Sequence, residues 1–182
     1  AVRIVHNAKV QRPSVCNALD TLIVHFGVAD RFIPAVAKEL WRSGVELRCD
    51  QRSADLLEKC GDYELLKLAG EADYDTEFLG LTAAIRIVDS IDEAIAHIEL
   101  HGSNHSEAII TQDNFSANRF RREVDASAIF VNASTRFNDG YEFGLGAEVA
   151  ISTNKLHAYG PMGLREITSY KWVVTGTGQV RS

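Results

Sequence analysis

Three cysteines are the residues of this 182-residue sequence best suited to act as nucleophiles: Cys16, Cys49 and Cys60. Cys16 follows Pro13, which ends a helix-forming stretch, and its neighbour Asn17 favours a turn. Nucleophilic thiols are often held on such turns, between rigid elements yet accessible. A lone cysteine is also commonly structural, so local evidence leaves both roles open for Cys16. We expect Cys49 and Cys60 to be core or surface thiols.

Small polar side chains and an arginine follow the apolar segment 127–131: Asn132, Ser134, Thr135 and Arg136. In an open α/β sheet, ligands bind beyond the carboxyl ends of the strands. A guanidinium there can bind an anion through two parallel hydrogen bonds. An anion site and a solvated loop are equally compatible with this pattern.

Three histidines have the spacing i, i+4, i+8, which is compatible with metal binding: His97, His101 and His105. Gly102 interrupts the expected helix before the third of them, and neither a carboxylate nor a cysteine stands at ligand spacing. We therefore interpret these histidines as structural and expect no metal site.

The composition is that of a folded domain with a substantial core. Hydrophobic residues make up 46% of the sequence, and the formal net charge is −6. An acidic surface argues against non-specific nucleic-acid binding, which needs a basic face. No apolar run reaches the roughly 20 residues of a bilayer span, and the start of the sequence has no signal-peptide pattern. An odd cysteine count without metal-like spacing predicts a reducing compartment, so we expect a cytoplasmic protein.

Strands and helices are predicted to alternate along the chain. Strand signals fall at residues 19–25, 45–48, 85–88, 108–111 and 127–131, and helical signals fall at residues 2–8, 30–43, 52–59, 91–101 and 114–123. This alternation predicts an α/β fold with a mostly parallel sheet flanked by helices. We expect residues 61–81 to be mostly loop and residues 138–164 to be loop-rich. Residues 168–175 alternate as a half-buried strand does and should pair with another segment or another subunit.

Local signals fix several helix ends. The apolar residues of helix 30–43 lie on one face: Phe32, Ile33, Val36 and Leu40. Gly44 suits the position after the helix, and Pro34 should lie near the first turn. Ser90 and Glu93 form a predicted capping box at the start of helix 91–101, and Asp113 is predicted to cap the helix that runs to about Glu123.

Several stretches, in order, resemble a known family. They are 7–17, 77–79, 88–109 (with Ala94-Ile95-Ala96-His97-Ile98 and Gly102-Ser103-Asn104-His105-Ser106-Glu107), 131–137, Asp139-Gly140, 143–149 and Gly160-Pro161-Met162-Gly163-Leu164. In this order they resemble γ-glutamyl phosphate reductase, also called glutamate-5-semialdehyde dehydrogenase, of the aldehyde dehydrogenase superfamily. The resemblance spans nearly the whole chain and is far more specific than any single motif in it.

The resemblance implies a reaction and a set of site residues. The family reduces γ-glutamyl phosphate with NADPH to glutamate-5-semialdehyde and phosphate, in proline biosynthesis. Cys16 matches the catalytic cysteine, which would form a thioester. Glu77 and Phe78 match a cofactor-binding motif near the nicotinamide ribose, and the substrate pocket would be lined by Asn132, Ser134, Thr135, Arg136 and Phe143. Arg136 is the residue expected to bind the α-carboxylate or the phosphate.

The resemblance also implies a domain organisation. Residues 1–158 would form the catalytic, thiol-bearing domain, and residues 159–182 would form an arm whose strand supports homo-oligomerisation. The NADPH-binding domain would belong to an amino-terminal half outside this sequence, so the chain by itself should be inactive. Tyr159 departs from the family pattern, which often has arginine at that position.

Three other functions stay open at this point. The chain could belong to an ordinary NAD-dependent aldehyde oxidiser of the same superfamily, although the motifs at 132–137 and 160–163 argue against it. It could be a non-enzymatic domain that oligomerises through its last strand. A cysteine hydrolase that uses His6 or His157 as its base is the remotest alternative, because no spacing supports that pairing.

Overall fold

Short apolar strands separated by amphipathic helices pair in parallel, because each helix carries the chain back to the start of the next strand. The computed structural model describes residues 1–58, 60 and 64–182. Its main sheet is parallel and four-stranded, in the order β1 (Thr21–His25), β4 (Thr82–Val88), β2 (Glu46–Cys49) and β3 (Leu66–Leu68). The predicted α/β class with a mostly parallel sheet is confirmed.

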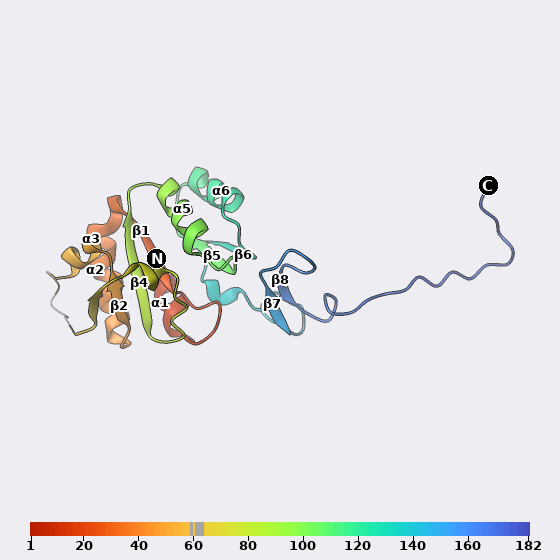
Figure 1. Ribbon diagram of the computed structural model, residues 1–182, viewed down its shortest axis with the longest axis horizontal. Coiled ribbons are helices and arrows are strands. Elements are labelled where there is room, and N and C mark those ends of the chain that lie inside the picture. Colours follow the sequence, from red (N-terminus) through yellow and green to blue (C-terminus); the bar gives the residue numbers. More distant parts are fainter. Residues whose placement is uncertain (59, 61–63) are drawn as a thin grey trace.

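A second, smaller parallel sheet lies beside the first one (Figure 1). It contains β5 (Ser106–Ile109) and β6 (Ala128–Val131), joined by α6 (Asn114–Glu123). Ile95 of α5 (Ile91–His101) packs with Phe120 and Val124 in a small core of its own. Beyond it, β7 (Ala150–Ser152) and β8 (Gly160–Met162) form an antiparallel pair.

The main core forms where α2 (Phe26–Arg42) packs on the first sheet. Ile33, Val36 and Leu40 of this helix are essentially inaccessible, as the apolar spacing predicts. Full burial of one such side chain contributes about 1.5–3 kcal/mol. Both α1 (Val2–Val10) and α3 (Gln51–Leu57) pack against α2. None of the described helices is long and apolar enough to cross a membrane.

The two ends of α2 differ in how well the sequence predicts them. Gly44 has φ +74°, and its N–H donates to the carbonyl of Trp41 at 2.8 Å, so the predicted glycine stop is confirmed. The start is four residues earlier than expected, because the His25 side chain accepts the N–H of Gly27 and caps the helix. Pro34 therefore lies inside the helix, and its expected place near the first turn is wrong.

The capping box at residue 90 is confirmed in one half only. The Ser90 hydroxyl accepts the N–H of Glu93 at 3.1 Å. The Glu93 carboxylate, however, accepts the N–H of Asp89 at 2.6 Å rather than that of Ser90. The predicted bounds of α5, and those of α6 with its Asp113 cap, are confirmed.

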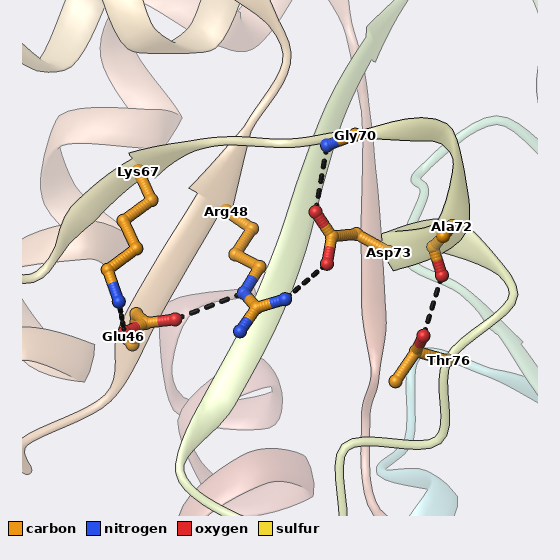
Figure 2. A network of polar contacts seen from close by, with 7 residues as sticks. All are labelled: Glu46, Arg48, Lys67, Gly70, Ala72, Asp73 and Thr76. Carbon is orange, nitrogen blue, oxygen red and sulfur yellow. Dashed lines mark hydrogen bonds and ion pairs between the residues drawn. The ribbon is translucent and has the colours of Figure 1, made fainter.

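The expectation of a loop over residues 61–81 is wrong for part of that segment, and residues 61–63 lie outside the described part. The segment contains β3 and the single turn α4 (Glu71–Tyr74). A polar network fixes it (Figure 2): Arg48 on β2 pairs with Glu46 and with Asp73, while Lys67 on β3 pairs with Glu46. Pairing with a neighbouring strand, rather than any local pattern, defines so short a strand as β3.

Residues 168–175 form no strand in the single chain, so the expected strand is not shown and its pairing with another subunit stays a prediction. The segment runs away from the body of the molecule in extended form (Figure 1). Its large side chains are exposed, with Tyr170 and Trp172 each 85% exposed. The physical reason is that a strand needs backbone partners, and no described segment of this chain lies beside it.

Two of the three spaced histidines pack together on α5. The rings of His97 and His101 are 4.5 Å apart, and the ring of Tyr74 meets His97 edge-on at 5.0 Å. His101 Nδ1 lies 2.7 Å from a carboxylate oxygen of Asp75. Burial, with smaller effects of His101 and Arg86, lowers the pKa of His97 to about 4.

We predict that His97 makes the fold sensitive to acid. Between about pH 6.5 and pH 4 the unfolded chain binds a proton at His97 and the folded chain does not, so stability falls as pH falls. From pH 7 to pH 4, urea unfolding should show a loss about 3 kcal/mol larger for the wild type than for His97→Phe. Burial raises the pKa of Glu107 to about 7, which opposes this trend equally in both proteins. If the free energy of unfolding fell by the same amount in the wild type and in His97→Phe, the prediction would be contradicted.

Candidate active site

Cys16 lies on the turn between α1 and β1, as the sequence predicts. Two backbone hydrogen bonds close this turn: Ala18 N–H to Val15 O and Leu19 N–H to Ala8 O, each 2.9 Å long. The Cys16 side chain is exposed. The turn therefore presents the thiol to solvent from a rigid base.

The next residue, Asn17, ties this turn to a distant part of the chain. Its side-chain N–H donates to the carbonyl of Asn138 at 2.9 Å, and its own carbonyl accepts the hydroxyl of Thr135 at 2.7 Å. Asn17 is 4% exposed, so water competes little for these bonds. The fold thus brings the Cys16 turn against the polar segment that follows β6.

Arg136 also contacts Asn17, and its positive charge has no carboxylate partner within the described part of the chain. Its guanidinium donates to the side-chain oxygens of Gln11, at 2.9 Å, and of Asn17. Within the described part of the chain it forms no ion pair. A guanidinium held in place by neutral groups is suited to binding an anion.

The other residues predicted for the substrate pocket hold the loop in shape. Ser134 is buried and caps the short 3-10 helix η1 (Thr135–Phe137) by accepting the Arg136 N–H at 3.3 Å. The Asn132 amide exchanges two hydrogen bonds of 2.9 Å with the backbone of Thr111. It thereby locks the end of β6 to the end of β5, and a φ of +58° turns the chain there.

Phe143 lies on the loop-rich segment, 47% exposed, with its ring stacked 6.5 Å from that of Phe130. The same segment supplies Glu148, whose carboxylate accepts the N–H of Gly140 at 2.6 Å.

The surroundings of Cys16 disfavour its thiolate. Partial burial and the negative charges of Glu148 and Glu77 raise the pKa of the Cys16 thiol, while the backbone N–H of Cys16 and the charge of Arg136 act in the opposite direction. At neutral pH the sulfur of the chain by itself is therefore protonated. Cys49 is fully buried, and burial raises its pKa to about 12, which fits the expected core thiol.

Glu77 and Phe78 occupy different places relative to Cys16. Glu77 is exposed and lines the same open groove as Cys16 and Thr135. The Phe78 ring instead lies under the cations of Lys9 and Arg48, 5.8 and 5.2 Å from its centroid.

The backbone of Phe78 is also fixed. Its N–H donates at 3.2 Å to Asp20, which is also paired with the buried Lys9 at 3.4 Å. Phe78 is thus an anchor that sets the position of Glu77.

Four residues of this site were not assigned to it by sequence reasoning: Asn17, His105, Asn138 and Glu148. Asn17 stands next to Cys16, and that adjacency is a usable signal. The other three lie about 90 to 130 residues further along, and no local pattern relates them to the thiol. Only the pairing of β5 with β6 and the fold of the segment after it bring them near.

Solved structures of similar shape define the class of fold. A propionaldehyde dehydrogenase of Clostridium phytofermentans is 14% identical with a TM-score of 0.59, over 88% of this chain and 44% of that one. An engineered glycolyl-CoA reductase solved with NADP+ bound is 15% identical with a TM-score of 0.53. At these identities they show the fold alone, and that fold is of the aldehyde dehydrogenase type.

Closer relatives narrow the class. The chain is 45% identical to γ-glutamyl phosphate reductase of Thermotoga maritima, with a TM-score of 0.90 over all of this chain and 42% of that one. It is 56% and 59% identical to the γ-glutamyl phosphate reductases of Dehalococcoides mccartyi and Chloroflexus aurantiacus, over its whole length. No family model matches it. The chain is thus a homologue of the γ-glutamyl phosphate reductases, as its motifs predict, and spans about 42% of their length.

We predict that Glu148→Gln activates Cys16. Because the carboxylate disfavours the thiolate, its removal should speed alkylation of Cys16 by iodoacetamide a few-fold at pH 7.5 and shift the rate profile to lower pH. Peptide mass mapping separates Cys16 from the other cysteines. Buried Cys49 is the internal control and should stay unmodified in both proteins. An unchanged or slower rate at Cys16 would contradict the assigned electrostatics.

Proposed function

We propose that this chain supplies the nucleophile and the substrate pocket of a γ-glutamyl phosphate reductase, a cytoplasmic enzyme of proline biosynthesis. The whole enzyme would convert γ-glutamyl phosphate to glutamate-5-semialdehyde and phosphate with NADPH. The observation that carries the proposal is an exposed thiol beside an arginine with no ionic partner in the described chain, in a homologue of proteins with that name.

The proposed chemistry begins at the Cys16 sulfur. The exposed thiol first loses its proton to solvent, which the positive charge of Arg136 favours. The thiolate then attacks the acyl carbon: a C–S bond forms, the C–O bond to phosphate breaks, and phosphate leaves with the electron pair. The backbone N–H of Cys16 would stabilise the oxyanion that develops. Bound NADPH would supply the hydride that releases the aldehyde from the thioester.

Within this proposal, Arg136 binds the anionic group of the substrate. Thr135, Ser134 and Asn132 hold the loop that carries it, as their hydrogen bonds to Asn17, to η1 and to Thr111 suggest. Phe143 supplies an apolar wall, which its exposed face permits. The acidic substrate then meets one fixed cation and several neutral donors.

Among the described residues, Glu77 is suited to contact a nicotinamide cofactor. Glu77 offers an exposed carboxylate in the Cys16 groove, a suitable acceptor for ribose hydroxyl groups. We propose that Glu77 contacts the cofactor and that Phe78 positions it from beneath Lys9 and Arg48. The rest of the NADPH site would belong to the part of the relatives that this chain does not span.

We also propose a division into a thiol-bearing domain, residues 1–158, and an arm, residues 159–182, that binds a second copy of the protein. The support is the row of exposed apolar side chains from Tyr170 to Val174 on an extended backbone. Such a segment can pair with a strand of another copy and bury those side chains.

Cys16→Ser in the full-length protein tests the central proposal. An alcohol is a far weaker nucleophile than a thiolate, so we expect semialdehyde formation to fall by at least about a thousandfold. When NADPH is withheld, the wild-type protein should gain the mass of the acyl group, and the Cys16→Ser protein should not. Cys60→Ser is the matched control and should keep full activity, because Cys60 is an exposed thiol that does not line the groove of Cys16. Near wild-type turnover by Cys16→Ser would overturn the assignment.

Arg136 is tested by a graded pair of variants. Arg136→Lys keeps the charge and loses the bidentate geometry, whereas Arg136→Gln loses both. We expect KM for the acyl phosphate to rise about tenfold in the lysine variant and about a hundredfold in the glutamine variant, with smaller changes in kcat. Equal KM values for all three proteins would remove Arg136 from the binding site.

A further inference from the structure

His105 has an unused hydrogen-bonding atom at the Cys16 groove. It is 7% exposed, and it lines the groove together with Cys16 and Glu77. Its Nε2 is buried and has no hydrogen-bond partner within the described part of the chain. Leaving a buried polar atom unpaired is unfavourable, so its presence at a groove points to a ligand.

Neighbouring side chains fix which ring nitrogen carries the proton. The Asn138 amide approaches the carbonyl of His105 at 3.5 Å, and because a carbonyl only accepts, its NH₂ must face that way. The same NH₂ donates to the hydroxyl of Ser106 at 2.7 Å. His105 Nδ1 lies 2.7 Å from that hydroxyl and is the acceptor available for its proton. With the Ser106 hydroxyl donating to Nδ1, the ring proton is on Nε2, the atom without a partner.

The ring is also neutral at physiological pH, since burial lowers the pKa of His105 despite the opposing charges of Glu77 and Glu148. The same two carboxylates act on Cys16, so both side chains share one electrostatic environment. Asn138 joins them physically, because its backbone carbonyl accepts the side chain of Asn17 at 2.9 Å. A neutral N–H donor is thus held at the site of the thiol.

We propose that the Nε2–H group of His105 donates a hydrogen bond to a phosphoryl oxygen of the acyl phosphate bound at Cys16. This inference rests on the proposed function and assigns it a further substrate-binding residue. His105 is not the base for the thiol, because Nε2 already carries a proton and the Nδ1 lone pair is occupied by Ser106. It keeps its proton while phosphate departs. Glu77 and Glu148, whose charges act on both Cys16 and His105, repel a phosphate, and Arg136 and His105 would together offset that repulsion.

Two amide substitutions separate this role from simple packing. In His105→Gln the side-chain NH₂ can reach the position of Nε2, whereas in His105→Asn it reaches only that of Nδ1. Inorganic phosphate is the probe, and the rate of Cys16 alkylation by iodoacetamide is the readout. We expect phosphate to slow alkylation in the wild type and His105→Gln, with half-protection needing at least about tenfold more phosphate in His105→Asn. Equal protection in all three proteins would overturn the proposal.

Nitrogen NMR of the unsubstituted chain tests the same idea without relying on a variant that folds. The His105 ring should show the Nε2–H tautomer, and its Nε2 signal should move when phosphate is added. Ser106→Ala should lose the single tautomer. An Nδ1–H tautomer, or an Nε2 signal indifferent to a phosphate concentration that protects Cys16, would contradict the proposal.

The failures of the two proposals can be told apart. If Cys16→Ser abolishes acyl-enzyme formation in the full-length protein while His105→Asn leaves phosphate protection intact, the role of His105 is wrong and the proposed function stands. If Cys16 is never acylated but phosphate still moves the Nε2 signal, the proposed function fails and the anion contact of His105 is supported.

Discussion

The hydrogen bonds of Asn17 hold the candidate site together. They join the turn that carries Cys16 to a loop about 120 residues further along the chain, through both the side chain and the backbone of one buried residue. Cys16 precedes a strand of the main sheet and Arg136 follows a strand of the second sheet, so these bonds bridge the two sheets. A contact between residues so far apart in the sequence requires the closure of a long loop, which costs conformational entropy. Geometry at the sulfur therefore depends on the whole chain rather than on its own turn.

The balance of charge around the sulfur explains how this geometry affects reactivity. Two carboxylates act against the thiolate and one guanidinium acts for it, and the carboxylates together with burial prevail. A protonated thiol is a poor nucleophile and a poor target for oxidants. The arrangement keeps the exposed sulfur in its less reactive form until the local charge changes. Binding of a substrate or a partner domain in the groove is the kind of event that would change it.

The sequence predicted elements with strong local signals and missed those defined by distant contacts. The starts of helices α5 and α6 were predicted correctly because Ser90 and Asp113 cap them. The strand β3 was missed, because its three residues are defined by pairing with β2. Cys16 and Arg136 could be proposed from the motifs that surround them. The place of His105 in the groove of Cys16 could not, because the fold and no local motif brings these two residues to the same groove.

The extended segment after β8 has a consequence for how the protein behaves in solution. From Tyr170 to Val174 its aromatic and branched side chains are exposed and it forms no strand, so a strand there would have to pair with residues outside the described chain. Where those residues belong to a second copy, order in this segment depends on protein concentration by mass action. A dilute sample would keep the tail accessible to proteases, while a concentrated one would protect it. The same tail makes self-association, productive or aggregating, a property of the chain that grows with its expression level.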